Sequence, residues 1–259
     1  MTTRARSLLS GLVTALAALA RSGDADAEAA APAKPTPPKV SLVAISHVPT
    51  PVPADPAPPK ITQAQMHVTL GAVKRLGSGR FSVTDPKVRM VVPTTQDDAQ
   101  VSFRYLGPTA KTAPLASGEI RRQVGLKLRA ANGCNVVYAM WRFEPKNQLV
   151  VSVKRNDGKS VHAQCGAHGY HDVPAGVYQA PPTPRVGASH ALRAKITQGR
   201  LHVSIDDKLV WDGALPGDAF AFDGPTGLRS DNVRLELDFH ARPRPAGLSS
   251  FVVVASDED

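Results

Sequence analysis

The stretch NVRLELDFH, residues 232–240, decides the fold because apolar and polar side chains alternate along it without a break. A period of two places alternate side chains on opposite faces of a β-strand, so this run predicts a strand with one buried and one wet face. The runs IRRQVGLKLRA (120–130) and RLHVSID (200–206) alternate in the same way. No window after the first 29 residues has sustained helical periodicity. The sequence therefore predicts an all-β fold, an antiparallel sandwich of two sheets.

Further segments are also expected to be strands, one of them after the turn Asn156-Asp157-Gly158. They are 66–70, 80–83, 88–92, 99–105, 134–143, 149–154, 160–165 and 191–196. The acidic turn Asp206-Asp207-Lys208 is expected to join the strand 200–205 to the run LVW (209–211) as a hairpin. One domain with many short strands follows, and the sequence shows no internal repeat.

The residues LHVSIDDKLVWDGALPGDAFAFDGPTGLRSDNVRLELDF (201–239) carry a family resemblance. The stretch resembles the closing part of concanavalin A-like lectin/glucanase and laminin-G-like jelly rolls. These folds show a hairpin with a short acidic turn, then a glycine turn, here GLRSDN, and a last long strand. The resemblance covers about the final 70 residues well and extends more loosely back to Glu119. Its motifs are structural rather than catalytic. The resemblance therefore implies a jelly-roll sandwich and only suggests carbohydrate or glycan binding.

The first 29 residues read as a secretory signal, in which Arg4 and Arg6 precede an apolar stretch at 7–20. That stretch is too short to span a bilayer, and the alternative is an uncleaved amphipathic or buried helix. Residues 30–60 are rich in proline and are expected to be a semi-extended linker. Within it, 40–48 is either an edge strand or more linker. The remaining residues, 61–259, are then one β-sandwich domain, exported to a periplasm or the exterior, with no transmembrane segment.

Cys134 and Cys165 are the only cysteines in the chain. Export would place both thiols in an oxidising compartment, where a lone pair of cysteines usually forms a disulfide. A meander of strands between them would bring the two Cα atoms to the ~6 Å separation that the bond requires. The alternatives are a pair of metal ligands, or a free nucleophile near a histidine. We expect a disulfide that staples the fold.

Two candidate chemical sites are weak. Glu236 and Asp238 share a strand face, but a glycosidase needs two carboxylates that bracket the glycosidic bond, and no third acid follows this pair. The run 162–172 also contains possible metal ligands, although their spacing matches no known site. These are His162, His168, His171 and Asp172. We therefore expect no metal, no cofactor and no catalysis, while a triad assembled from distant residues stays open.

The net charge of +9 is stronger evidence for a partner. Basic side chains share strand faces in two places, with Lys127 and Arg129 beside Gln123 in one and Arg193 with Lys195 in the other. A positive face would favour anionic polysaccharide or lipopolysaccharide phosphate. Ordinary surface charge is the alternative. Nucleic acid is not expected, because no groove-reading motif is present.

The strand expected at 134–143 is apolar on both faces, with Tyr138 on one and Trp141 on the other. One face would pack on the partner sheet, and the other needs a ligand or a loop such as 170–183 to cover it. We expect a carbohydrate or anionic glycan to bind a monomer near this strand; a structural or protein-interaction module of the cell envelope is the alternative. The candidate ligand-binding residues are Lys127, Arg129, Tyr138, Trp141 and Arg142.

Overall fold

The computed structural model describes residues 55–245 and residue 247. The expected signal at 1–29 and most of the expected linker, including 40–48, lie outside the described residues. Within the described part of the chain, no helix has the length and apolar character that a membrane crossing requires. The strands of this part form two antiparallel sheets and its helices are short, which confirms the predicted β-sandwich.

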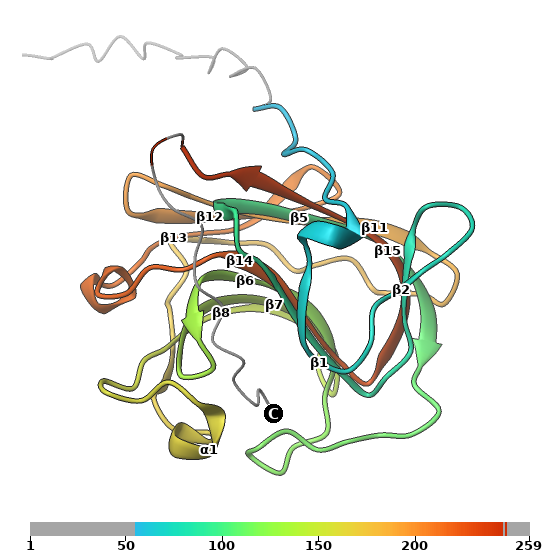
Figure 1. Cartoon of the computed structure of the whole chain (residues 1–259), viewed down its shortest axis with the longest axis horizontal. Coiled ribbons are helices and arrows are strands. Elements are labelled where there is room, and N and C mark those ends of the chain that lie inside the picture. Colours follow the sequence, from blue (N-terminus) through green and yellow to red (C-terminus); the bar gives the residue numbers. More distant parts are fainter. Residues whose placement is uncertain (1–54, 246, 248–259) are drawn as a thin grey trace, which may run out of the picture. The chain divides into compact units, whose positions relative to one another are not determined.

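The first sheet has seven strands and curves around one side of the molecule (Figure 1). Its strands pair antiparallel in spatial order, from one edge to the other. They are β1 (His67–Leu70), β4 (Lys87–Val92), β14 (Thr226–Asp231), β6 (Arg122–Asn132), β7 (Asn135–Glu144), β8 (Gln148–Lys154) and β9 (Tyr170–Asp172).

The second sheet has eight strands and packs face to face on the first. They are β10 (Val177–Tyr178), β13 (Lys208–Ala214), β12 (Arg200–Ile205), β11 (Ser189–Thr197), β5 (Thr95–Pro108), β15 (Val233–Pro243), β3 (Phe81–Val83) and β2 (Lys74–Arg75). The helices of the described chain are short. They are η1 (Gln63–Gln65), α1 (His162–Cys165) and η2 (Gly217–Phe220).

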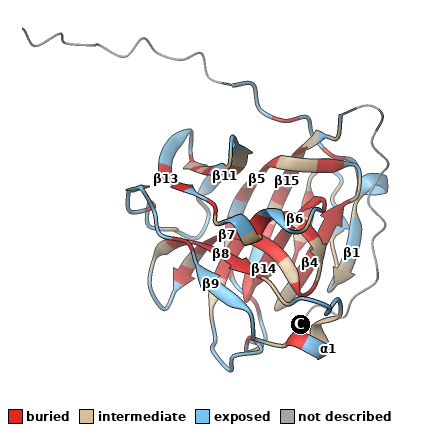
Figure 2. Cartoon of the chain, turned by 90° about the vertical axis from the view of Figure 1, so that its left-hand side faces the viewer, coloured by how far each residue is buried: buried red, intermediate tan, exposed pale blue. Residues whose placement is uncertain are grey.

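The core lies between the two sheets and follows the alternation of the sequence. In β15, every second residue from Val233 to Ala241 is fully buried, and the residues between them are exposed or partly exposed. Figure 2 shows the buried strands in red at the centre of the sandwich. Across the interface, Trp141 of β7 meets Phe103 of β5 edge to face, with the ring centroids 5.9 Å apart. This contact joins the two sheets at their centre.

The predicted hairpin joins β12 to β13, where Ile205 pairs with Lys208. Asp206 and Asp207 between them both have positive φ angles, 52° and 62°. A two-residue turn with both central residues in this region matches the right-handed twist of the strands it connects. The hairpin prediction is therefore confirmed. Its physical reason is local, because aspartate tolerates this backbone conformation better than most residues do.

Residues 160–165 do not form the expected strand, and α1 occupies this place instead. The side-chain oxygen of Gln164 accepts hydrogen bonds from the N–H groups of Ser160 and Val161, at 3.0 and 3.3 Å. Backbone N–H groups at the start of a helix have no partner within the helix, and these two bonds satisfy such groups just before the first turn of α1. Gly166, with a φ of 50°, then ends the turn.

The run GLRSDN was expected to be a glycine turn, but most of it lies in β14, between β4 and β6. Polar residues are costly in a central strand unless they find partners. Here Arg229 and Asp231 lie on the same face and pair with each other at 3.0 Å. The pairing makes a polar strand compatible with the middle of the sheet.

Arg129 was expected to share a face with Lys127, and it does not. Its φ is 50°, and the register between β6 and β7 slips between Leu128 and Asn132. A bulge of this kind shifts the alternation by one residue. The Arg129 guanidinium therefore turns away from Lys127 and donates to the carbonyl oxygen of Phe222 at 2.7 Å.

The last residues of the expected linker contact the eight-stranded sheet. Ala241 donates its N–H to the Pro59 carbonyl at 3.0 Å, and the Arg193 side chain donates to the Asp55 carbonyl at 2.9 Å. Residues 55–60 therefore pack against the outer side of this sheet in the structure.

Candidate functional site

A pocket of about 390 Å³ lies on the face of the seven-stranded sheet that points away from the core. Its floor is built from β6, β7, β8 and β14, where these strands pair side by side. One wall comes from the segment 115–121, and the opposite wall from α1 and the residues that follow it. Figure 1 shows α1 and the segment before β6 on this outer side of the sheet.

Two glycines, Gly125 and Gly227, lie in the middle of strands that form the floor. Gly125 of β6 pairs with Met140 of β7 on one side and with Arg229 of β14 on the other. A Cβ atom at Gly125 would come within 2.4 Å of the Met140 sulfur, so the Met140 side chain fills the space that the glycine leaves. In the next row Gly227 pairs with Lys127. A Cβ atom at Gly227 would come within 2.1 Å of the Met90 carbonyl oxygen, so neither position has room for a side chain.

A buried ionic network lies under one end of the pocket. The fully buried Asp231 carboxylate contacts Arg89 at 2.5 Å and Arg229 at 3.0 Å, and it accepts a hydrogen bond from the Gln123 amide at 2.6 Å. Burial alone would raise the pKa of Asp231, but the two guanidinium groups and the amide outweigh burial and hold that pKa well below its ordinary value. One carboxylate thus neutralises two arginines from neighbouring strands.

Two tyrosines lie side by side in the pocket. The rings of Tyr138 and Tyr170 stack at a centroid distance of 6.0 Å, with an angle of 22° between their planes. Arg229 lies 5.1 Å from the Tyr138 ring and Lys154 lies 5.1 Å from the Tyr170 ring, so each ring also carries a cation–π contact. Burial raises the pKa of Tyr170, but the positive charges of Arg229 and Lys154 lower it below its ordinary value. The stack is an aromatic surface in a positive field.

Arg142 supplies a charged group whose donors are not all used. It lines the pocket, and its Nε atom is buried without a hydrogen-bond partner among the described residues. Burial lowers the pKa of Arg142, and the nearby charge of Arg121 lowers it further. Arg121 itself pairs with Glu119, and Asp172 also lines the pocket. Because Arg142 lines a concave site, its guanidinium favours an anionic or acceptor-rich ligand there.

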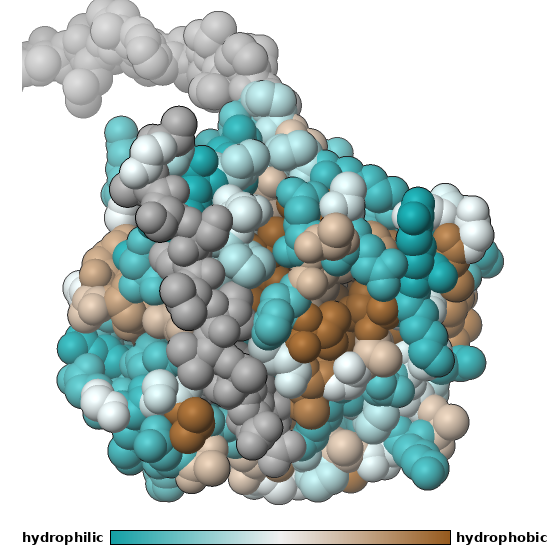
Figure 3. Space-filling view, in the orientation of Figure 1, coloured by the Kyte–Doolittle hydropathy of each residue, from teal (hydrophilic) through white to brown (hydrophobic). Residues whose placement is uncertain are grey.

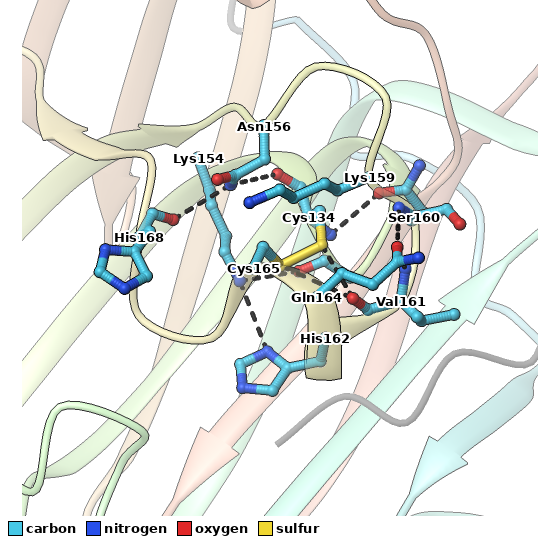
Figure 4. Close-up of a disulfide and its surroundings, with 12 residues drawn as sticks. Cys134, Lys154, Asn156, Lys159, Ser160, Val161, His162, Gln164, Cys165 and His168 are labelled. Atoms are coloured by element: carbon cyan, nitrogen blue, oxygen red, sulfur yellow. Dashed lines mark hydrogen bonds between the residues drawn. A yellow bond between two sulfur atoms is a disulfide. The ribbon is translucent and has the colours of Figure 1, made fainter.

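The disulfide between Cys134 and Cys165 holds the α1 wall against the sheet. Its Cα atoms are 5.9 Å apart, and it closes a loop with a sequence separation of 31, which confirms the predicted bond. Figure 4 shows how hydrogen bonds support it: the Asn156 amide donates to the carbonyl oxygens of Cys134 and His168, at 3.2 and 3.0 Å. The Lys154 ammonium donates to the Gly133 carbonyl at 2.9 Å. This wall is attached covalently and at several polar points.

The opposite wall depends on Asn232, a buried residue with a φ of 55° between β14 and β15. Its side-chain amide donates to the carbonyl oxygens of Ala113 and Arg121, both at 2.9 Å, and its side-chain oxygen accepts from the Ala113 N–H at 2.8 Å. One asparagine therefore fixes both ends of the segment that forms this wall.

Of the expected ligand-binding residues, the structure places Tyr138 and Arg142 in the pocket. Lys127 pairs with Tyr138 in the register and is fully buried beside the pocket. Trp141 lies in the core, where its indole N–H donates to the Asn147 side chain at 2.9 Å. Arg129 contacts Phe222 and stacks over the Phe220 ring, away from the pocket. Tyr138 and Arg142, both on β7, are therefore the expected ligand-binding residues that line this pocket.

The other candidate groups lie elsewhere. Asp238 is on β15 of the eight-stranded sheet and pairs with Lys60 at 2.6 Å and with Arg80 at 3.4 Å, on the outer face that it shares with Glu236. Within the described ranges, no three His, Cys, Asp or Glu side chains converge in a group that fits a metal ion. Arg193 and Lys195 pair with acids on the outer face of that sheet and are remote from the pocket lining.

Sequence reasoning missed several pocket residues. Tyr170 and Asp172 belong to a short edge strand that has no period-two signal of its own. Arg229 was hidden in a run that resembled a turn. Its one available signal was Asp231 two residues later, since opposite charges at i and i+2 in a strand lie on the same face. Arg121 and Glu119 come from the segment before β6, whose position over the sheet depends on Asn232.

No family model matches this sequence, and no curated protein matches it. Similar solved structures include the carbohydrate-binding module CBM66 from Bacillus subtilis, which is 14% identical, with 72% of this chain and 100% of that chain covered and a TM-score of 0.47. A galectin from the ball sponge Cinachyrella sp. is 15% identical, over 61% of this chain and 99% of that chain, with a TM-score of 0.39. The Crh5 transglycosylase is 14% identical, over 76% of this chain and 87% of that chain, with a TM-score of 0.43. The likeness is distant, so the β-sandwich assignment rests on the two sheets described above.

Proposed function

We propose that this chain is an exported, monomeric, non-catalytic binding module with a concanavalin A-like jelly-roll fold, whose pocket binds an acidic saccharide. The observation that carries the proposal is Arg142, a guanidinium that lines a concave site beside two stacked tyrosines. The pocket volume of about 390 Å³ falls within the ~300–1,000 Å³ of small-molecule sites. A guanidinium fork recognises a carboxylate or sulfate by paired hydrogen bonds.

The two tyrosines would supply the apolar part of the affinity. Tyr170 is 39% exposed and Tyr138 only 4%, so a sugar ring would contact Tyr170 first. Aromatic rings present a flat apolar face to the C–H groups of a sugar, and their hydroxyl groups remain available for hydrogen bonds. The arginines would then select for negative charge among saccharides of similar shape. Lys127, buried beside Tyr138, adds to the positive field.

Export is supported by the disulfide, since such bonds persist mainly in oxidising compartments. The ligand would therefore be a saccharide of the cell envelope or the exterior. Trp141 and Arg129, which were candidate ligand residues, are given packing roles in this proposal because neither lines the pocket.

The test is a glycan array probed at low and high salt with the wild type and two arginine variants. Arg142→Met removes the guanidinium from the pocket but keeps much of its apolar volume. Arg104→Met removes the same charge from an exposed position on β5, outside the pocket lining. We expect binding to uronate or sulfated glycans that weakens with salt and is lost in the first variant only. No binding to any glycan, together with a protein partner found by pull-down, would favour the interaction module instead.

A glycoside hydrolase is the second candidate, because two carboxylates, Glu119 and Asp172, line the same pocket. Retaining and inverting glycosidases both use such a pair on either side of the scissile bond. Incubation with a panel of polysaccharides followed by an assay for new reducing ends separates the two functions. If the wild type releases reducing ends and the Glu119→Gln variant does not, the protein is a glycoside hydrolase and not a binding module.

A further inference from the structure

Acids as well as arginines line the pocket. The acids are Glu119 and Asp172, and the arginines are Arg121, Arg142 and Arg229. Arg121 and Glu119 pair with each other, and Arg229 pairs at 3.0 Å with the buried carboxylate under the floor. Within this described lining, those pairs leave Arg142 and Asp172 as one cation and one anion for the groups of a ligand.

The sheet register separates Arg142 from Asp172. Arg142 of β7 pairs with Gln148 of β8. Asp172 of β9 pairs with Ser152, four residues further along β8. That step is about 13 Å along a strand, and β9 lies two strand spacings, about 10 Å, from β7. The pocket therefore has a positive end at Arg142 and a negative end at Asp172.

The side chains between these two ends are mainly apolar. Met140 and Tyr138 lie on the face of β7 that carries Arg142, because alternate residues of a strand share a face. Tyr138 stacks with Tyr170, which is two residues before Asp172 in β9. Figure 3 shows apolar and hydrophilic surface side by side in the orientation of Figure 1. The C–H groups of a sugar suit the apolar middle, while its charged substituents can reach the two ends.

The two charges select against a ligand that is negative at both ends. An anionic group beside Asp172 would meet a like charge, whereas an ammonium group there would form a charge-assisted hydrogen bond. Burial and the charge of Arg121 lower the pKa of Arg142, and the negative charge of Asp172 opposes that decrease, so the two ends already act on each other. A ligand with one group of each sign is complementary to both ends.

We propose that Asp172 determines specificity and that the preferred ligand is a zwitterionic saccharide, with a carboxylate or sulfate at the Arg142 end and a free amino group at the Asp172 end. The inference rests on the function proposed above, because it requires an acidic saccharide to bind this pocket. It assigns Asp172 to an ion pair with the ligand and not to the acid–base pair of a hydrolase.

Matched pairs of acidic oligosaccharides test the inference. Hyaluronan, chondroitin and heparosan oligosaccharides are each titrated in the N-acetylated form and after removal of the acetyl groups, at about pH 6, where the amino group is protonated. We expect the wild type to bind the free-amine form of at least one pair several-fold more tightly, with a difference that shrinks at high salt. The amino group makes the saccharide less negative, so attraction to a positive surface alone would give the opposite order.

Two aspartate variants separate the ion pair from a general effect of charge. Asp172→Asn should lose the preference and bind the N-acetylated form at least as tightly as the wild type does, which also shows that the variant folds. Asp157→Asn removes the same charge from a side chain that is 78% exposed and lies outside the pocket lining. This control should keep the preference of the wild type.

Three results would overturn the inference and leave the proposed function standing. They are equal affinities of the wild type for both forms of every pair, a preference that Asp172→Asn retains, and an Asp172→Asn variant that binds neither form. Failure of the wild type to bind either form of any pair would also overturn the inference. The proposed function falls with it only if the glycan array finds no other acidic ligand.

Discussion

Replacing Asp231 by asparagine removes the carboxylate that pairs with both Arg89 and Arg229 under the pocket floor. All three side chains are at least nine-tenths buried, so the variant would keep two buried cations without their counter-ion. Removing one partner of a buried ion pair costs ~3–5 kcal/mol in the free energy of unfolding. For a domain of this size that corresponds to a melting temperature lower by on the order of 10 °C.

The destabilisation caused by Asp231→Asn should also depend on pH, in a direction that the pKa of Asp231 determines. The two arginines hold the pKa of Asp231 in the folded chain well below its ordinary value, whereas in the unfolded chain it is close to ~3.9. A group with a depressed folded pKa stabilises the fold fully above its unfolded pKa and loses that contribution as the pH falls toward the folded one. The advantage of the wild type over Asp231→Asn should therefore be greatest near neutral pH and shrink below about pH 4.

Urea unfolding at pH 7 and at pH 3, followed by tryptophan fluorescence, measures both effects. Asp238→Asn is the matched control, because Asp238 also pairs with two cations but lies on an outer face with its side chain 21% exposed. Its loss should cost less than ~1 kcal/mol, as is usual for pairs near the surface. If Asp231→Asn costs no more than this control, or costs as much at pH 3 as at pH 7, the reasoning about the buried network is wrong.

Three further predictions address the disulfide, the floor and the core. Replacing both cysteines by alanine should lower the free energy of unfolding by roughly 3–4 kcal/mol and weaken saccharide binding. Denaturation and ligand titration of the same samples measure the two effects, and unchanged stability would contradict the loop-closure argument. Gly227→Ala places a Cβ 2.1 Å from the Met90 carbonyl oxygen and should destabilise by roughly 1–3 kcal/mol in urea unfolding, whereas Gly77→Ala, with open space around it, should not. Trp141 and Trp211 are both buried, so their emission should be blue-shifted, resistant to iodide quenching and unchanged by ligand; a ligand-dependent shift would place a tryptophan at the site.

The strands of the sandwich could be predicted because their signal is local. The alternation in β15 needs only neighbouring residues to be recognised, and the turn at Asp206 and Asp207 carries its own conformational preference. The disulfide was predictable because two cysteines allow only one pairing. These features depend on residues close together in sequence or on simple counting.

The site depended on contacts that spacing does not contain. β14 was missed because its polar residues are tolerable only next to Arg89, which is 142 residues from Asp231. The bulge at Arg129 shifts the alternation by one residue, so a correct strand prediction still assigned that side chain to the wrong face. Tyr170 comes from an edge strand that pairs with β8 over only three residues. Long-range pairing, not local pattern, decides which side chains meet in the pocket.

The place of Asn232 has a mechanical consequence. β14 ends at Asp231 in one sheet and β15 begins at Val233 in the other, so this single residue carries the chain across the sandwich. Its amide also fixes both ends of a pocket wall, while the disulfide fixes the other wall. Sliding of one sheet over the other would therefore strain the wall instead of opening it. We therefore expect a rigid pocket that selects ligands by their fit between fixed walls, and not one that widens to accommodate larger ligands.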